Sequence, residues 1–301
     1  MSRSPHDYPH HARSLVDQHR PIPNFERAVP EPDLKDLDAF SPTIQYPDFD
    51  RFPQERTHYE FDRDRYHLRH SEIYTMAEAG KFRVVSLEDL ESYVYSGNRD
   101  MMHRDLGNLE RQELIKRHAS RYPDHVRVIT LASQGKRFLQ RAVGKGGQKF
   151  YSGLKKVREL RHDTALYRIY QAKAQEIQDA GGKVKRVILD YELKKKVNRD
   201  LGKATQLDSM EEARLKEKLS QEHDIPLING SFVVPDVRVE YEDCDGNECR
   251  VDLEYLTETY RHGDISAKAQ AGFVLYAPHD QAPRLHRVLD QHRTMAEILS
   301  L

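Results

Sequence analysis

Proline is distributed very unevenly along this chain of 301 residues, and this limits where a folded core can form. Nine of the fourteen prolines precede residue 57, among His, Asp and Arg residues and without sustained apolar periodicity. Proline lacks a backbone N–H and fixes φ, so such a segment suits neither a helix interior nor a central strand. The sequence therefore predicts a disordered arm over residues 1–57. Its histidines His6, His10, His11 and His19 lack the fixed geometry that a metal site needs.

Composition excludes several classes of protein. No stretch approaches the roughly 18 apolar residues that a membrane span needs, and the first residues lack the apolar segment of a secretory signal. We therefore expect a cytoplasmic protein that does not contact a membrane. The two cysteines, Cys244 and Cys249, are too few for a disulfide framework or a four-thiolate zinc site. Both are expected to be reduced thiols.

Residues 58–141 show the pattern of short helices followed by strands. Apolar residues recur at helical spacing, and Ser86 with Asp89 three residues later forms a helix-start signal. The expected elements are helices over 70–82, 87–95 and 99–117, a strand over 125–131 and a last helix over 133–141. Three helices, a strand and a basic turn predict a winged helix-turn-helix domain, which is a DNA-binding fold.

Charge is strongly separated along the chain, although the formal net charge is −1. Residues 1–57 sum to −3, residues 58–161 to +7 and residues 162–301 to −5; the stretch 111–161 has 14 basic and 3 acidic side chains. A run of like charge repels itself unless an anion is present, and nucleic acid is such an anion. The alternative is a solvated basic face. Because the run coincides with the winged-helix pattern, duplex DNA is the favoured partner.

The winged-helix interpretation assigns roles to individual basic residues. One face of the third helix would enter the major groove, while the wing and the last helix would contact phosphates. The groove-facing residues are Arg99, His103, Arg104 and Arg111. The phosphate contacts are Arg121, Arg127, Lys136 and Arg137. Residues 142–161 form a basic linker to the next domain.

Residues 162–290 alternate helix and strand, and residues 291–301 form a short tail. The expected elements are a helix over 162–182, strands over 183–193, 232–243, 248–258 and 272–277, and helices over 209–224 and 264–268. Such alternation predicts a small mixed sheet with helices packed on it. The whole chain is therefore expected to be α+β, with a winged helix followed by an α/β domain.

The second domain carries acidic residues at strand spacing. Residues two apart share a face, so Asp236 lies with Arg238 and Glu240, and Asp252 lies with Glu254. A three-residue hairpin loop over 245–247 would pair Glu240 with Asp252 and Arg238 with Glu254. Two carboxylates that face each other repel, so this pair needs either a bound cation or free exposure to water. Carboxylate oxygens are ligands that suit Mg²⁺ or Mn²⁺.

Two further carboxylates extend this acidic face. Asp190 and Glu192 are two residues apart at the end of the strand expected over 183–193, so they would add to one site if the strands are neighbours. The alternative is a solvated sheet face that holds no metal. His162 and Asp163, at the start of a helix, fit either a nuclease accessory pair or an ordinary helix cap.

The second domain resembles the PD-(D/E)XK nuclease core in two short motifs, Pro235-Asp236 and Asp252-Leu253-Glu254. Both motifs lie on the hairpin that is expected after a helix and a strand. The resemblance implies that Asp236 and Asp252 hold the metal, with Glu192 or Glu254 as an additional ligand. It also implies a lysine two residues after the second acid, which positions the attacking water. Glu254 stands there instead, and Lys268 on the following helix is the candidate to replace that lysine.

Four segments together are similar to the replication-relaxation family of plasmids and other mobile elements: residues 129–139, 162–171, 186–193 and 235–243. The similarity covers about residues 65–276 and implies a DNA-binding protein of replication, relaxation or transfer. Its nuclease-like domain would serve binding or assembly, with other mobile-element proteins or a second copy of the chain as further partners. Two alternatives stay open: an active Mg²⁺- or Mn²⁺-dependent DNA endonuclease and a winged-helix transcriptional regulator.

Overall fold

The computed structural model describes residues 55–61, 64–119, 126–143, 147–154, 159–203, 208–283 and 298–300. These residues belong to one compact unit. The predicted arm up to residue 54, Arg121 in the predicted wing, and parts of the predicted linker and tail lie outside the described residues. The fold is mixed α+β, as the sequence predicts. Within the described part, no helix combines the length and apolar character that crossing a bilayer requires.

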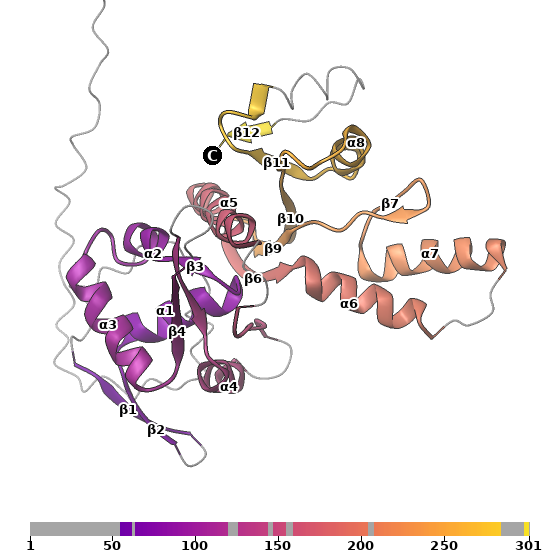
Figure 1. Cartoon of the computed structure of the whole chain (residues 1–301). Coiled ribbons are helices and arrows are strands. Elements are labelled where there is room, and N and C mark those ends of the chain that lie inside the picture. Colours follow the sequence, from indigo (N-terminus) through magenta and orange to yellow (C-terminus); the bar gives the residue numbers. More distant parts are fainter. Residues whose placement is uncertain are drawn as a thin grey trace, which may run out of the picture. The chain divides into compact units, whose positions relative to one another are not determined.

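The first part of the fold combines a hairpin, four helices and a small sheet (Figure 1). In chain order it contains β1 (Thr57–Phe61), β2 (Asp64–Leu68), α1 (His70–Lys81), β3 (Val85–Ser86), α2 (Leu87–Tyr93), α3 (Arg99–Arg111), β4 (Ile115–Ala119), β5 (Arg127–Leu131) and α4 (Ser133–Ala142). Strands β3, β5 and β4 form one antiparallel sheet in that order. The sequence analysis predicted the helices and β5, but it predicted none of β1, β2, β3 and β4.

Local side chains explain where these helices begin and end. Ser86 accepts a hydrogen bond from the backbone N–H of Asp89 at 3.0 Å, which confirms the predicted start of α2. Asn98 caps α3 in the same way, through Met101 N at 3.0 Å. The helix expected over 99–117 ends at Arg111, because Glu113 adopts a left-handed φ of 56° and the following residues join the sheet as β4.

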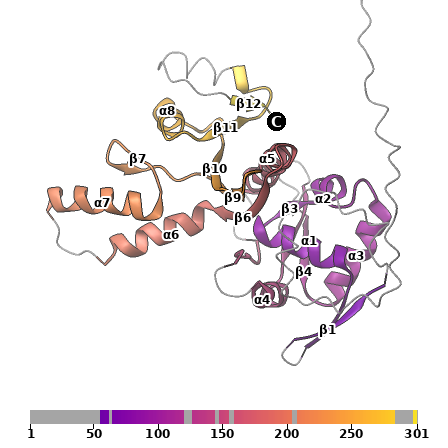
Figure 2. The ribbon, with the colours of Figure 1, turned by 180° about the vertical axis from the view of Figure 1, so that it is seen from behind.

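The second part surrounds a five-stranded sheet (Figure 2). It contains α5 (Leu160–Asp179), β6 (Lys183–Leu189), α6 (Asp190–Leu201), α7 (Ser209–His223), β7 (Leu227–Ile228), β8 (Ser231–Phe232), β9 (Val237–Glu242), β10 (Glu248–Tyr255), α8 (His262–Gln270), β11 (Val274–Ala277) and β12 (Ile298–Ser300). The strand order is β12-β11-β10-β9-β6. Strands β6, β9 and β10 are antiparallel neighbours, whereas β11 runs parallel to β10.

Two predictions about this sheet are wrong. The strand expected over 183–193 ends at Leu189, and Asp190 and Glu192 lie in the first turn of α6, where carboxylates favour the helix dipole. The hairpin loop has five residues, 243–247, instead of three, so Arg238 pairs with Asp252 and Glu240 with Arg250. Asp243 stabilises the longer loop by accepting hydrogen bonds from Asp245 N and Asn247 N at 2.9 and 2.8 Å.

One hydrophobic core runs through both parts of the fold. It includes Phe82, at the end of α1, together with Tyr167 and Tyr170 of α5 and Val239 of β9. The Phe82 ring lies 5.2 Å from the Tyr167 ring and 4.8 Å from the Tyr170 ring, measured between centroids. Helix α5 therefore packs against the helices of the first part and the sheet of the second.

Candidate functional site

Helix α3 exposes a basic face whose opposite side is buried. Met102, Leu106 and Leu109 are in the hydrophobic core, whereas His103 and Arg104 are exposed. Arg99 and Arg111, at the two ends of the helix, are exposed as well. This division follows the 3.6-residue period of the helix. The four residues predicted to face DNA therefore lie on the surface of α3.

A buried polar network fixes α3 against α1. The Asp105 carboxylate, with no exposed side-chain surface, accepts from Ser71 Oγ at 2.5 Å and from Arg69 Nη1 at 3.0 Å. Nearby, Glu72 of α1 accepts from Arg56 Nη2 at 2.8 Å and from Asn108 Nδ2 at 3.0 Å. Such charge-assisted bonds are stronger than neutral ones, and they specify the position of the helix.

The basic residues predicted to contact DNA differ in their partners within the chain. Arg99 pairs with Glu91 at 3.0 Å and Arg127 with Glu88 at 3.2 Å, both at the surface. Arg111 donates to Gly107 O at 3.2 Å on its own helix. The side chains of His103, Arg104, Lys136 and Arg137 have no hydrogen-bond or ion-pair partner among the described residues. Exposed pairs of this kind contribute little to stability, so phosphate can compete for these arginines.

A second cluster forms where β9 begins and β10 ends. Asp236 N donates to Glu254 Oε2 at 3.1 Å, and Tyr255 N donates to Asp236 Oδ2 at 3.0 Å. Glu254 Oε1 accepts from Tyr260 Oη and from Lys268 Nζ, each at 2.7 Å. Glu254 is fully buried. Three residues of the predicted catalytic set, Asp236, Glu254 and Lys268, therefore meet, and the sequence analysis did not identify Tyr260.

His162, in the first turn of α5, closes this cluster on its other side. Its Nε2 lies 3.2 Å from Asp236 Oδ2, and its Nδ1 lies 3.6 Å from Asp163 Oδ1. Burial alone would lower the pKa of His162, but its hydrogen bonds with Asp163 and Asp236 raise that pKa to about 10. Although burial opposes it, the same contact lowers the pKa of Asp236. The two groups therefore form a cation and an anion at neutral pH.

The other predicted catalytic residues lie in separate ion pairs. Both oxygens of Asp252 accept from Arg238, at 2.7 and 2.9 Å. Glu192 Oε1 contacts Arg186 Nη2 at 2.5 Å and Lys149 Nζ at 2.8 Å. The Arg238 guanidinium forms a bidentate pair with the two Asp252 oxygens, so a cation of the chain already neutralises this carboxylate. The structure therefore places Glu254, rather than Asp252, beside Asp236.

Two carboxylates in this cluster have the oxygen chemistry that Mg²⁺ and Mn²⁺ prefer. Asp236 Oδ1 accepts no hydrogen bond from the described residues, and Glu254 Oε2 accepts one, from Asp236 N. These two oxygens could hold a cation, although Lys268 and Tyr260 already occupy Glu254 Oε1. A different group of three, Asp200, Glu222 and His223, lies at the ends of α6 and α7. Asp200 there is already neutralised by Arg199 and Lys203, which disfavours a metal.

Glu254 should make stability depend on pH. Burial and the nearby Asp236 charge raise its pKa from 4.5 to about 7. The folded protein therefore binds a proton that the unfolded chain releases, and this group's contribution to stability falls as pH rises from about 4.5 to about 7. In Glu254→Gln, urea unfolding at pH 5 and pH 8 should show this decrease reduced by about 2–3 kcal/mol relative to wild type. An unchanged decrease would contradict the assignment.

Comparison with known proteins finds no family model that matches this chain, no similar curated protein and no similar solved structure.

Proposed function

We propose that this chain is a DNA-binding protein that holds duplex DNA with the exposed face of α3. The element order α1, β3, α2, α3, β4, β5 and the antiparallel sheet order β3-β5-β4 support a winged helix-turn-helix arrangement. In that arrangement α3 is the recognition helix and the β4–β5 connection is the wing. The observation that carries the proposal is the exposed pair His103 and Arg104 on a helix whose other face is fixed in the core.

Replacing Arg104 by glutamine should weaken binding to a duplex oligonucleotide. An arginine in the major groove donates hydrogen bonds to base edges, so its loss removes those bonds together with one positive charge close to the DNA. We expect Arg104→Gln to reduce affinity by about five- to tenfold in fluorescence anisotropy at low salt, a change of about 1–1.4 kcal/mol. Arg214→Gln, an exposed arginine of α7, is the matched control and should bind as wild type does. Equal losses in both variants would contradict a role for α3.

The α/β part then serves binding or assembly in replication, relaxation or transfer of a mobile element. Its carboxylates are largely taken up by cations of the chain, as Asp252 with Arg238 and Glu192 with Arg186 illustrate. This arrangement supports a structural role, with further proteins of the element or a second copy as partners. A transcriptional regulator would differ by binding a single operator sequence tightly, and comparison of random and selected duplexes separates the two roles.

A metal-dependent DNA endonuclease is the second candidate function. The order of elements in the second part supports a PD-(D/E)XK-like core: a helix (α5), three antiparallel strands (β6, β9, β10), a helix (α8) and a parallel strand (β11). Elements α6, α7, β7 and β8 are inserted after β6. Asp236 and Glu254 would hold Mg²⁺ or Mn²⁺, which lowers the pKa of bound water and stabilises charge on phosphate. Lys268 reaches Glu254 from α8 and donates to Val234 O at 2.7 Å, which fixes its ammonium beside both acids.

Nicking of supercoiled plasmid in Mg²⁺ or Mn²⁺ distinguishes the two candidates. If the endonuclease exists, Asp236→Asn should abolish nicking, because the substitution removes the charge that faces the metal. Glu240→Gln is the matched control, since Glu240 lies on β9, the strand that follows Asp236, but opposite Arg250. Duplex binding without nicking in either metal would support the binding and assembly role. Nicking that survives Asp236→Asn would rule out this cluster as its source.

A further inference from the structure

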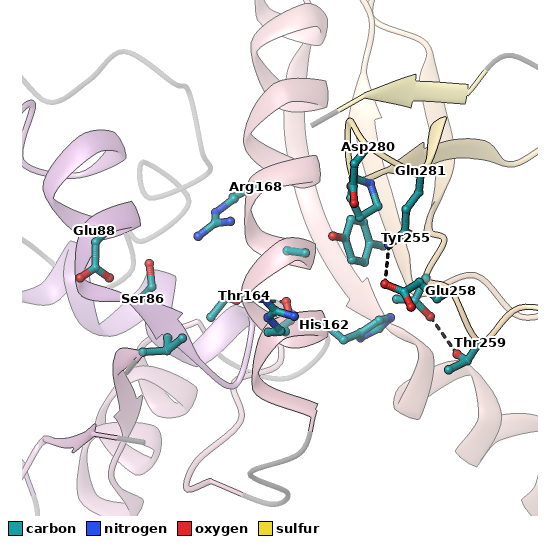
Figure 3. Close-up of a pocket in the computed structure, with 15 residues that line it drawn as sticks. Ser86, Glu88, His162, Thr164, Arg168, Tyr255, Glu258, Thr259, Asp280 and Gln281 are labelled. Atoms are coloured by element: carbon teal, nitrogen blue, oxygen red, sulfur yellow. Dashed lines mark hydrogen bonds between the residues drawn. The ribbon is translucent and has the colours of Figure 1, made fainter. Parts of the chain in front are cut away.

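A cavity of about 700 Å³ is lined in part by His162, the residue that also contacts Asp236 (Figure 3). Its lining comes from five segments: the first turns of α5, the end of β10 with the residues after it, the residues after β11, the β3–α2 junction, and Val126 just before β5. The lining side chains that carry the argument are Arg161, Arg168, Tyr255, Glu258, Asp280 and Gln281. The volume is within the range of pockets that hold small organic ligands.

The topology of the sheet independently favours a ligand at this place. Strands β10 and β11 are parallel, and the cavity begins where both end, at Tyr255 and just after Ala277. In α/β sheets, ligands bind outside the carboxyl ends of parallel strands. The N-terminus of the 20-residue helix α5 lies at the same place, and the positive end of its helix dipole favours an anion.

The α5 wall of the cavity can bind a phosphate group. Arg161 and Arg168 lie two turns apart on α5. Arg168 Nε donates to Asp89 Oδ1 at 2.8 Å, which uses one of the five guanidinium N–H groups and leaves the others for another acceptor. Both arginines line the cavity, and Figure 3 shows Arg168 on the side of α5 that faces Ser86 and Glu88. Glu88, the acidic residue of the β3–α2 wall, is paired with Arg127.

The opposite wall has different chemistry. Figure 3 shows Tyr255, Glu258, Asp280 and Gln281 gathered on the side of α5 away from Ser86 and Glu88. Gln281 Nε2 donates to Glu258 Oε1 at 3.0 Å, so the two side chains hold each other in place. Carboxylates at such strand ends accept hydrogen bonds from ribose hydroxyls. The Tyr255 ring lines the cavity as well, and an aromatic ring there suits contact with a planar base.

We propose that this cavity is a binding site for a nucleoside monophosphate group, either free or at the end of a nucleic-acid strand. The phosphate lies against Arg161, Arg168 and the start of α5, the sugar hydroxyls against Glu258 and Asp280, and the base against Tyr255. Because the walls come from both parts of the fold, the ligand bridges β3 and α2 to the carboxyl ends of β10 and β11. The site is separate from the α3 face, so it does not depend on duplex binding.

Titration calorimetry and thermal melting of the full chain with AMP test this site in the absence of DNA. AMP should bind with Kd of about 10–100 µM and raise Tm. Adenosine, which lacks the phosphate, and ribose 5-phosphate, which lacks the base, should each bind at least tenfold more weakly. A single-stranded ribo-oligonucleotide that binds more tightly with a 5′-phosphate than without it, and more tightly than AMP, identifies a strand end as the source of the group. An oligonucleotide whose binding the 5′-phosphate does not change identifies the free nucleotide.

Two variants keep the test decisive. Arg161→Gln should weaken AMP binding at least tenfold, and Tyr255→Leu should remove the preference for AMP over ribose 5-phosphate. Arg199→Gln is the control, because this exposed arginine of α6 pairs with the adjacent Asp200 and does not line the cavity. Absence of heat and of a Tm shift at about 1 mM AMP would overturn the proposal. Equal binding by wild type, Arg161→Gln and Tyr255→Leu would overturn it as well.

Discussion

Substitution of Arg238 by methionine should lower the free energy of unfolding by about 3–5 kcal/mol, enough to remove much of the stability of an ordinary domain. Arg238 lies on β9 and is only 3% exposed. Its guanidinium donates to both oxygens of Asp252, at 2.7 and 2.9 Å, and to Asp224 O at 2.7 Å. Without it, Asp252 keeps a negative charge in a site with little water. Urea unfolding followed by far-UV circular dichroism measures the loss.

The companion double variant shows whether the loss comes from the unpaired charge. A buried pair that is replaced as a whole by apolar residues often costs little, whereas removal of one partner leaves the other charge uncompensated. Arg238→Met combined with Asp252→Leu should therefore recover most of the stability that Arg238→Met loses. Arg250→Met, at the exposed end of β10 opposite Glu240, removes only a surface ion pair with Asp224 and should change stability by less than about 0.5 kcal/mol. A double variant no more stable than Arg238→Met would contradict the charge explanation.

The period of the side chains predicted much of this sheet but not its register. Val237 and Val239 of β9 and Leu253 of β10 are buried on one face, as strand alternation predicts. A shift of two residues preserves that alternation, so the three-residue and five-residue loops place the same residues in the core. Only the partners across the hairpin change. The predicted register placed Glu240 opposite Asp252, which brings two negative charges together. The observed register pairs opposite charges at both positions, Arg238 with Asp252 and Glu240 with Arg250.

The candidate site depended more on tertiary structure than on any local pattern. Asp236 and Lys268 were proposed from their positions after a proline and on the next helix, and the fold brings both to Glu254. Tyr260 could not be predicted as a member of the site. It lies in the connection between β10 and α8, and the sequence does not specify the path of that connection. Asp190 and Glu192 follow an apolar strand at strand spacing. Acidic residues are also common in the first turn of a helix. Asp190 and Glu192 lie in the first turn of α6, so here the helix signal was the correct one.

Substitution of Asp105 by alanine should lower the free energy of unfolding by about 2–4 kcal/mol, because it removes a buried acceptor from Ser71 and Arg69. Burial raises the pKa of Asp105, although the hydrogen bond from Ser71 lowers it. The buried negative charge of Asp105 therefore already destabilises the wild-type fold to some extent, and this offsets part of what its hydrogen bonds contribute. Asp105→Asn retains an acceptor for Ser71 and should therefore be less destabilising than Asp105→Ala. Thermal and urea unfolding of both variants measure the difference.

The same substitution tests whether the buried network positions α3 for DNA. Asp105 is buried and cannot contact a duplex, yet it joins α3 to Ser71 of α1 and to Arg69 just before it. Measured well below its Tm, Asp105→Ala should bind duplex more weakly than wild type, because the exposed face that carries Arg104 is no longer held in one orientation. Asp100→Ala removes an exposed acid from α3 and should keep stability within about 1 kcal/mol while strengthening binding, since it removes repulsion of phosphate. Wild-type affinity in folded Asp105→Ala would mean that α1 and Arg69 do not determine how α3 meets DNA.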